Sequence, residues 1–178
     1  LGSGILGIGH HYFWIGTPEE VEPRVAPMMM HAPKPGDPIG EFMMKIMTDP
    51  RSTQALSLLN TGGFDPNSRA CHAAEIGGGG GISNARGLAG MYAPLACGGE
   101  LGGVRLVDRA QLARMGEVSV ATNEDATLLI PTRFSLGFMK SMDNRRRPRG
   151  DRDSAILSSA AFGHVGAGGS IGFADPEL

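Results

Sequence analysis

Apolar and polar positions in the first part of the chain follow the spacing of short helices. Thr17 precedes Pro18 and predicts the N-cap of a helix that stops before Pro23. A second helix is predicted to start at Asp37 and Pro38 and to bury its methionines in the core. The apolar positions of this second helix are Ile39, Phe42, Met43, Ile46 and Met47.

Three further helices are predicted by an N-cap residue ahead of an apolar face. The first presents a leucine face and ends at the glycines of residues 62–63. The second ends at the glycines of residues 98–99, and Pro94 is expected to kink or shorten its last turn. The third is short and begins with a capping box. Their predicted caps are, in order, Asp49, Ser83 and Asp108.

The periodicity changes near Thr132, where every second residue becomes apolar. Residues 134–138 alternate in this way and predict a strand. Two more strands are predicted at residues 161–164 and 170–174, on either side of a glycine turn. Helices followed by about three antiparallel strands indicate the α+β fold class.

Charge and hydropathy narrow the possible partners. The chain has 16 basic and 18 acidic residues, a net charge of −2, which disfavours nucleic acid and anionic membrane surfaces. The basic run at residues 144–149 is interleaved with aspartates, so it predicts a solvated loop, with an anion or nucleic-acid contact as the alternative. No apolar stretch of about 18 residues and no secretory signal is seen. We expect no membrane span, and a cytoplasmic location is favoured; the oligomeric state stays open.

No pattern in the sequence supports a cofactor or a metal. Residues 2–7 match G-x-G-x-x-G, but only Leu1 stands before them, where a dinucleotide fold has a strand. The glycine run at residues 77–81 lacks the Gly-Lys-Ser/Thr of a phosphate loop. None of the five histidines has the H-E-x-x-H spacing, and Cys71 and Cys97 form no C-x-x-C pair, so two free thiols are expected.

Ser170 lies in a G-x-S-x-G match at residues 168–172. In α/β-hydrolases this pattern holds a nucleophilic serine at a turn from a strand into a helix. Residues 173–176 do not predict a helix, and no histidine follows to act as a base. Ser170 as the nucleophile is therefore the weaker alternative.

Residues 162–177 resemble the third conserved motif of the serine β-lactamase-related family, which includes class C β-lactamases, D-Ala-D-Ala peptidases and esterases. His164, Val165 and Gly166 stand at the K-T-G or H-x-G position of that motif. Further blocks follow the family order, and the likeness is closest to the esterase-like branch. These blocks are residues 14–26, 81–89 and 131–138. The resemblance implies that residues 1–178 are the C-terminal portion of a single β-lactamase-related domain, truncated at both ends.

The resemblance also implies roles for three residues. His164 would lie on a sheet-edge strand beside the nucleophile, and Gly166 would contact the substrate. The backbone N–H of Ala167 would be one donor of the oxyanion hole, which stabilises a tetrahedral oxyanion. The alternative is a plain glycine hairpin in which His164 is a partly buried polar residue.

Two motifs of the family are missing from the chain. The family's nucleophile is a serine followed three residues later by a lysine, but His31, Phe42 and Gly137 precede the three lysines at that distance. The tyrosine motif Y-x-N is also missing. We therefore expect part of a serine hydrolase that transfers an acyl group from a small ester or amide substrate, inactive by itself. The alternative is an inactive relative that serves as an interaction or assembly domain.

Overall fold

The computed structural model describes residues 12–29, 34–147 and 154–178, in which short helices precede a sheet. The G-x-G-x-x-G match at residues 2–7 lies outside these ranges. In chain order the elements are β1 (Phe13–Ile15), η1 (Glu19–Arg24), α3 (Glu41–Thr48), α4 (Thr53–Leu59), α5 (Arg69–Ala73), β2 (Gly81–Ser83), α6 (Ala85–Ala96), β3 (Glu100–Leu101), β4 (Val104–Arg105), α7 (Arg109–Gly116), β5 (Val120–Thr122), β6 (Thr132–Phe134), β7 (Met139–Lys140), β8 (Phe162–Val165) and β9 (Ile171–Ala174).

The main sheet is antiparallel, with the strand order β5-β6-β7-β8-β9. The predicted α+β class with antiparallel strands is confirmed, although this sheet has five strands where about three were expected. The strand predicted at residues 134–138 is wrong as a single element. The chain turns at Gly137, whose φ is 80°, and the Ser135 N–H donates to the Phe138 carbonyl at 2.8 Å. The alternation therefore spans the end of β6 and the start of β7.

One face of this sheet packs against α6 and α7. The most buried apolar residues there are Leu112, Phe162 and Ala174. The rings of Phe162 and Phe138 meet edge to face at 5.1 Å between centroids. Around them pack Tyr92, Leu95, Ala96, Val107, Met115 and Phe138. Gly172 permits this packing, because a Cβ at that position would lie 2.5 Å from Cε2 of Tyr92 on α6.

The opposite face of the β8–β9 hairpin is open in the described structure. Phe173 pairs with Gly163, and Ile171 pairs with Val165, so their side chains share the face away from Phe162. Phe173, Ile171 and Val165 are all exposed. Apolar side chains thus remain at the surface on one side of the sheet.

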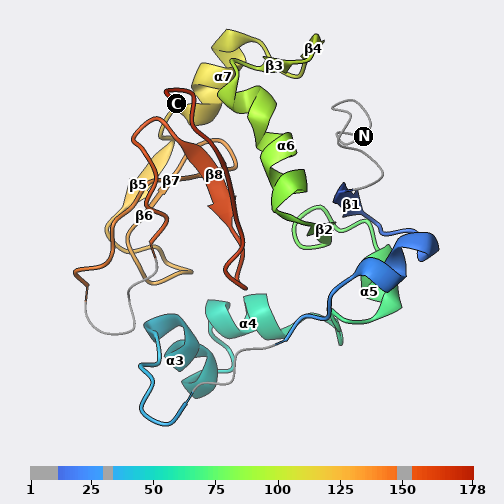
Figure 1. Ribbon diagram of the computed structural model, residues 1–178. Coiled ribbons are helices and arrows are strands. Elements are labelled where there is room, and N and C mark those ends of the chain that lie inside the picture. Colours follow the sequence, from blue (N-terminus) through green and yellow to red (C-terminus); the bar gives the residue numbers. More distant parts are fainter. Residues whose placement is uncertain (1–11, 30–33, 148–153) are drawn as a thin grey trace.

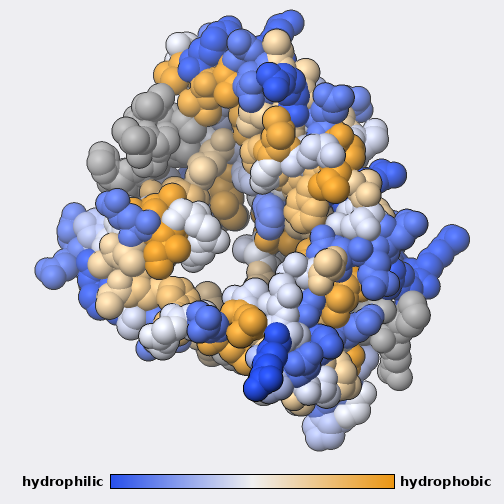
Figure 2. All heavy atoms as spheres, turned by 180° about the vertical axis from the view of Figure 1, so that it is seen from behind, coloured by the Kyte–Doolittle hydropathy of each residue, from blue (hydrophilic) through white to orange (hydrophobic). Residues whose placement is uncertain are grey.

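Figure 1 shows the elements arranged around a central opening: the sheet on one side, α6 next to it, β1, η1 and α5 across from the sheet, and α3 and α4 closing the ring. Figure 2 shows the same opening from behind, with apolar residues gathered along parts of its border. The β8–β9 hairpin runs along the opening, and its turn is at the end that points toward α4 in the view of Figure 1. Within the described ranges, no helix has both the length and the hydropathy needed to cross a bilayer.

Helices α4 and α6 are capped by other residues than predicted. Asp49 is the C-cap of α3, whereas the hydroxyl of Ser52 accepts from the Ala55 N–H at 3.1 Å and caps α4. Ser83 ends strand β2, and Asn84 caps α6. In both cases a second residue able to cap a helix lies one to three positions downstream and takes the N-cap position. The predicted residue belongs to the preceding helix or strand instead.

The two earliest helix predictions need correction as well. Thr17 is buried, and its N–H donates to the His72 carbonyl at 2.6 Å, so it ties the chain to α5 instead of capping η1. Pro23 lies inside η1, which ends one residue later at Arg24, so this 3-10 helix does not stop before the proline. Asp37 accepts from the Lys34 N–H at 2.7 Å in a turn, and α3 starts only after Gly40.

The predicted burial of the methionines is wrong. On α3 only Ile46 is buried, whereas Met43 and Met47 are exposed. The leucine face of α4 is exposed in the same way, with Ala55 as its buried apolar residue. Helical spacing shows which residues share a face, but it does not show whether another element covers that face.

The Asp108 cap of α7 is confirmed, since its carboxylate accepts from the Gln111 N–H at 2.7 Å. Asp108→Ala is expected to lower the free energy of unfolding by about 1 kcal/mol, because the amide loses its partner and the negative charge leaves the helix N-terminus. Urea denaturation measures the change. Asp108→Asn is the control that keeps an acceptor, and an equal loss in both variants would contradict the capping role.

Candidate functional site

The candidate site lies on the hairpin formed by β8 and β9. Within it His164 pairs with Gly172, and Val165 pairs with Ile171. The turn is closed by two hydrogen bonds, from the Gly166 N–H to the Ser170 carbonyl at 2.7 Å and from the Gly169 N–H to the Gly166 carbonyl at 2.9 Å. The two strands predicted around a glycine turn are confirmed.

His164 lies where the ladder between β8 and β7 has already ended. In the order of the sheet β8 is an interior strand, which corrects the expectation of an edge strand. However, only Phe162 and Gly163 pair with β7, so the second half of β8 pairs with β9 alone. Among the described residues this half therefore has an unpaired edge, at which a substrate or another segment can approach the backbone.

The side chain of His164 is exposed, in contrast to the alternative of a partly buried polar residue. Its Nδ1 lies 2.7 Å from the carbonyl oxygen of Val165. Because a carbonyl oxygen only accepts, Nδ1 carries the proton and donates it. In the neutral ring Nε2 then holds a lone pair that can accept a hydrogen bond from a hydroxyl group. The Phe134 ring lies beside it, with 6.4 Å between the ring centroids.

Ala167 lies in the turn, three residues after His164, and is exposed. Within the described residues its backbone N–H has no hydrogen-bond acceptor. An exposed, unpaired N–H held by a closed turn can donate to an oxyanion. The structure therefore leaves Ala167 available for the role that the sequence resemblance implies.

Gly166 contributes to the shape of the turn. Its N–H is already used by the Ser170 carbonyl, and a Cβ at this position would collide with Oγ of Ser170. A side chain at this position would require the Ser170 hydroxyl to move. Gly166 closes the turn through its backbone N–H and carbonyl, and contact with a substrate stays a prediction.

The structure argues against Ser170 as a nucleophile of the α/β-hydrolase kind. Strand β9 follows it at once, whereas that arrangement needs a helix. Ser170 is exposed at the end of a hairpin turn, and its carbonyl accepts the hydrogen bond that closes the turn. Its place is structural.

The remaining candidate groups offer little chemistry. Cys71 and Cys97 are free thiols, as expected. In the described part of the basic run, hydrogen bonds from the Arg145 side chain hold the pKa of the Asp143 carboxyl at about 2. This pairing agrees with a charge-compensated surface loop; residues 148–149 of the run lie outside the described ranges. No group of three or more metal-ligating side chains was found within those ranges.

Sequence reasoning missed one unusual residue, Lys140. Its side chain is 5% exposed, and its Nζ donates to the Ala160 carbonyl at 3.0 Å. The signal was present in part, because Lys140 continues the period-two pattern of Phe138 on the face of the sheet that packs against α6 and α7. Lysine is almost never fully buried without a partner, so the residue type gave no reason to expect burial at this position.

Comparison with known proteins identifies the family. The family model described as Beta-lactamase matches residues 4–178. The chain belongs to the β-lactamase family. Among curated proteins, the esterase/beta-lactamase LipL of Mycobacterium tuberculosis (strain ATCC 25618 / H37Rv) is 36% identical over 104 residues, which are 58% of this chain and 21% of that protein.

Solved structures of the β-lactamase family share the fold. EstA from Arthrobacter nitroguajacolicus Rue61a matches with a TM-score of 0.73 and 28% identity, over 98% of this chain and 42% of its own. A penicillin-binding protein homolog from Caulobacter crescentus matches with 0.68 and 26%, over 98% and 41%. A family VIII carboxylesterase matches with 0.66 and 30%, over 93% and 38%. The chain thus spans about two fifths of each solved relative.

Proposed function

We propose that this β-lactamase-family chain supplies the oxyanion-hole hairpin of a serine hydrolase that cleaves carboxylic esters by acyl transfer. The observation that carries the proposal is the exposed, unpaired N–H of Ala167 in a closed turn, three residues after His164. The names of two relatives, an esterase/beta-lactamase and a carboxylesterase, support an ester as the substrate. The nucleophilic serine belongs to a segment outside residues 1–178, because no Ser-x-x-Lys occurs within them.

In this reaction the serine oxygen forms a bond to the acyl carbon, and the carbonyl π electrons move to the carbonyl oxygen. The resulting oxyanion accepts a hydrogen bond from the Ala167 N–H. The tetrahedral intermediate collapses and expels the alcohol, which takes up the proton of the serine hydroxyl. Water then attacks the acyl-enzyme, and the carboxylic acid and the free serine are released.

His164 would contribute to the same site through its side chain, whereas Ala167 contributes through its backbone N–H. With its Nδ1–H directed at the Val165 carbonyl, Nε2 is the nitrogen that can accept a hydrogen bond from the leaving or incoming hydroxyl group. The neighbouring Phe134 ring limits the orientations of the imidazole. His164 therefore holds a hydroxyl near the oxyanion donor of Ala167.

An inactive interaction domain is the second candidate. It is favoured by one observation, the lack of both Ser-x-x-Lys and Y-x-N in the 178 residues. The two candidates differ in what the full-length gene product does with an ester.

The test is hydrolysis of p-nitrophenyl butyrate by the full-length gene product. We expect turnover, with a kcat about 10- to 100-fold lower in His164→Ala, because one positioned hydrogen-bonding group is lost. Val165→Thr is the matched control; its side chain lies on the opposite face of β8, and it is expected to keep its activity. A folded full-length product without ester turnover would overturn the proposal in favour of the interaction domain.

A further inference from the structure

A cavity lies at the opposite end of β8 from His164. It has a volume of about 410 Å³ and opens to solvent between α7, the end of β7, the start of β8 and Pro176, which follows β9. This volume falls in the range of small-molecule sites. The lining residues that matter for its chemistry are Arg109, Leu112, Glu117, Lys140, Ala160 and Phe162.

The cavity contains a buried cation with unused donors. Lys140 is 5% exposed, and its ammonium makes one hydrogen bond, to the Ala160 carbonyl. An ammonium group has three N–H donors. Within the described residues Lys140 forms no ion pair; Asp175 acts on it only from a distance. Burial lowers the pKa of Lys140, and Asp175 opposes that change. A buried charge without a close counter-ion is costly, so an anion in the cavity would stabilise it.

The walls of the cavity are apolar, and its rim carries both charges. Leu112 and Phe162 belong to the buried core of the sheet and form the inner wall. Arg109 and Glu117, both exposed, lie at the rim with opposite charges. This arrangement suits a ligand with one negative charge and an apolar body, because a polyanion would meet the Glu117 carboxylate.

We propose that this cavity binds a small organic monocarboxylate, whose carboxylate pairs with Nζ of Lys140 and whose apolar body packs against Leu112 and Phe162. The cavity shares Phe162 of β8 with the hairpin but lies at the other end of that strand from His164, and the proposal does not depend on the proposed hydrolysis. Binding replaces the hydration that Lys140 loses by burial with a charge-assisted hydrogen bond.

Phenylacetate and the neutral 2-phenylethanol serve as paired probes, and amide shifts of the ¹⁵N-labelled full-length gene product report binding. We expect saturable phenylacetate shifts at Gly116 and Ala160, beside the cavity. Lys140→Met should weaken phenylacetate by about tenfold or more and leave the weaker 2-phenylethanol binding unchanged, since only the charge is lost. Lys45→Met, an exposed cation on α3, is the matched control and should bind as the unmodified chain does.

Ala113→Trp provides a second variant, because Ala113 is exposed on α7 and lines the cavity. The indole should fill the cavity and abolish binding of both probes while Lys140 stays in place. No saturable phenylacetate shift, equal affinity in Lys140→Met, or unchanged binding in Ala113→Trp would overturn the proposal. If Lys140→Met does not fold, Ala113→Trp and the comparison of the two probes decide the question alone.

Discussion

Replacing Ala167 by proline in the full-length gene product is expected to lower kcat for ester hydrolysis about 10²- to 10³-fold. Proline has no backbone N–H, so the oxyanion loses the donor that the turn holds exposed. KM should change much less, because the donor acts on charge that develops after binding. Steady-state kinetics with p-nitrophenyl butyrate separate the two constants.

Ala167→Gly is the matched control for this substitution. It keeps the N–H and removes only the methyl group, so its kcat should stay close to that of the unmodified enzyme. Circular dichroism and thermal unfolding of both variants check that the turn still folds. Equal losses in the glycine and proline variants, or a proline variant with full activity, would contradict the role of the Ala167 N–H.

Phe162→Ala is expected to lower the free energy of unfolding by about 3 to 5 kcal/mol. The Phe162 side chain is 1% exposed, lies at the centre of the core under α6 and α7, and contacts the Phe138 ring. The substitution leaves a cavity where the sheet and the two helices meet. Urea denaturation of the 178-residue chain measures the loss.

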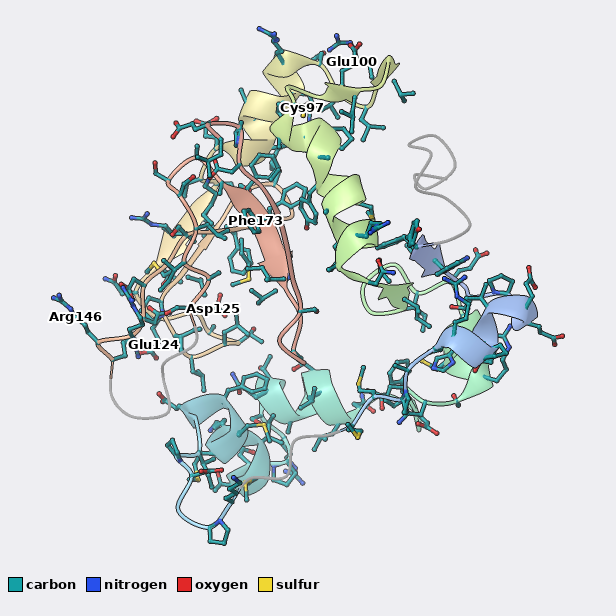
Figure 3. All side chains as sticks on the ribbon, viewed as in Figure 1. Cys97, Glu100, Glu124, Asp125, Arg146 and Phe173 are labelled. Atoms are coloured by element: carbon teal, nitrogen blue, oxygen red, sulfur yellow. The ribbon has the colours of Figure 1, made fainter. Side chains whose placement is uncertain are left out.

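Phe173→Ala is the control for the core substitution. Phe173 follows on the neighbouring strand but faces away from α6 and α7, and it is 45% exposed. Figure 3 marks its position on β9, between β8 and α6 in that view. Its loss should cost about 1 kcal/mol or less. Comparable losses of stability in the two variants would show that the core does not lie on the face of the sheet that packs against α6 and α7.

The hairpin of the candidate site was predictable because its signals are local. A strand, a glycine turn and a second strand follow one another within residues 161–174, and the β8–β9 pairing needs no distant partner. The chemical roles of His164 and Ala167 came from the family resemblance, and the structure adds the direction of the imidazole and the free N–H. These roles remain predictions.

Burial was predicted less well, because it depends on which elements meet. Met43 and Met47 have the spacing of a core face, yet both stay exposed although α3 contacts α4. The strand at residues 134–138 divided into two because a hairpin turn replaced the middle of the alternating pattern. Lys140 is the opposite case, a charged residue that is buried at the end of a strand.

Some features needed tertiary contacts that no local pattern encodes. Gln54 on α4 donates from its amide to the Ala126 and Thr127 carbonyls at 2.9 and 2.8 Å, and so ties α4 to the loop between β5 and β6. Figure 3 shows Asp125 of that loop at the end of the sheet nearest α3 and α4. The carboxylate of Asp125 accepts from the Thr127 and Leu128 N–H groups and organises the loop.

The central claim is that this β-lactamase-family chain provides the oxyanion donor while the nucleophilic serine belongs to another segment. Fluorophosphonate labelling of the full-length gene product, with the labelled peptide identified by tandem mass spectrometry, tests it most directly. The account predicts a label on a serine outside residues 1–178 that is followed three residues later by lysine, with equal labelling of Ser170→Ala. A label on Ser170, on any other serine of the 178 residues, or on no serine at all would contradict it.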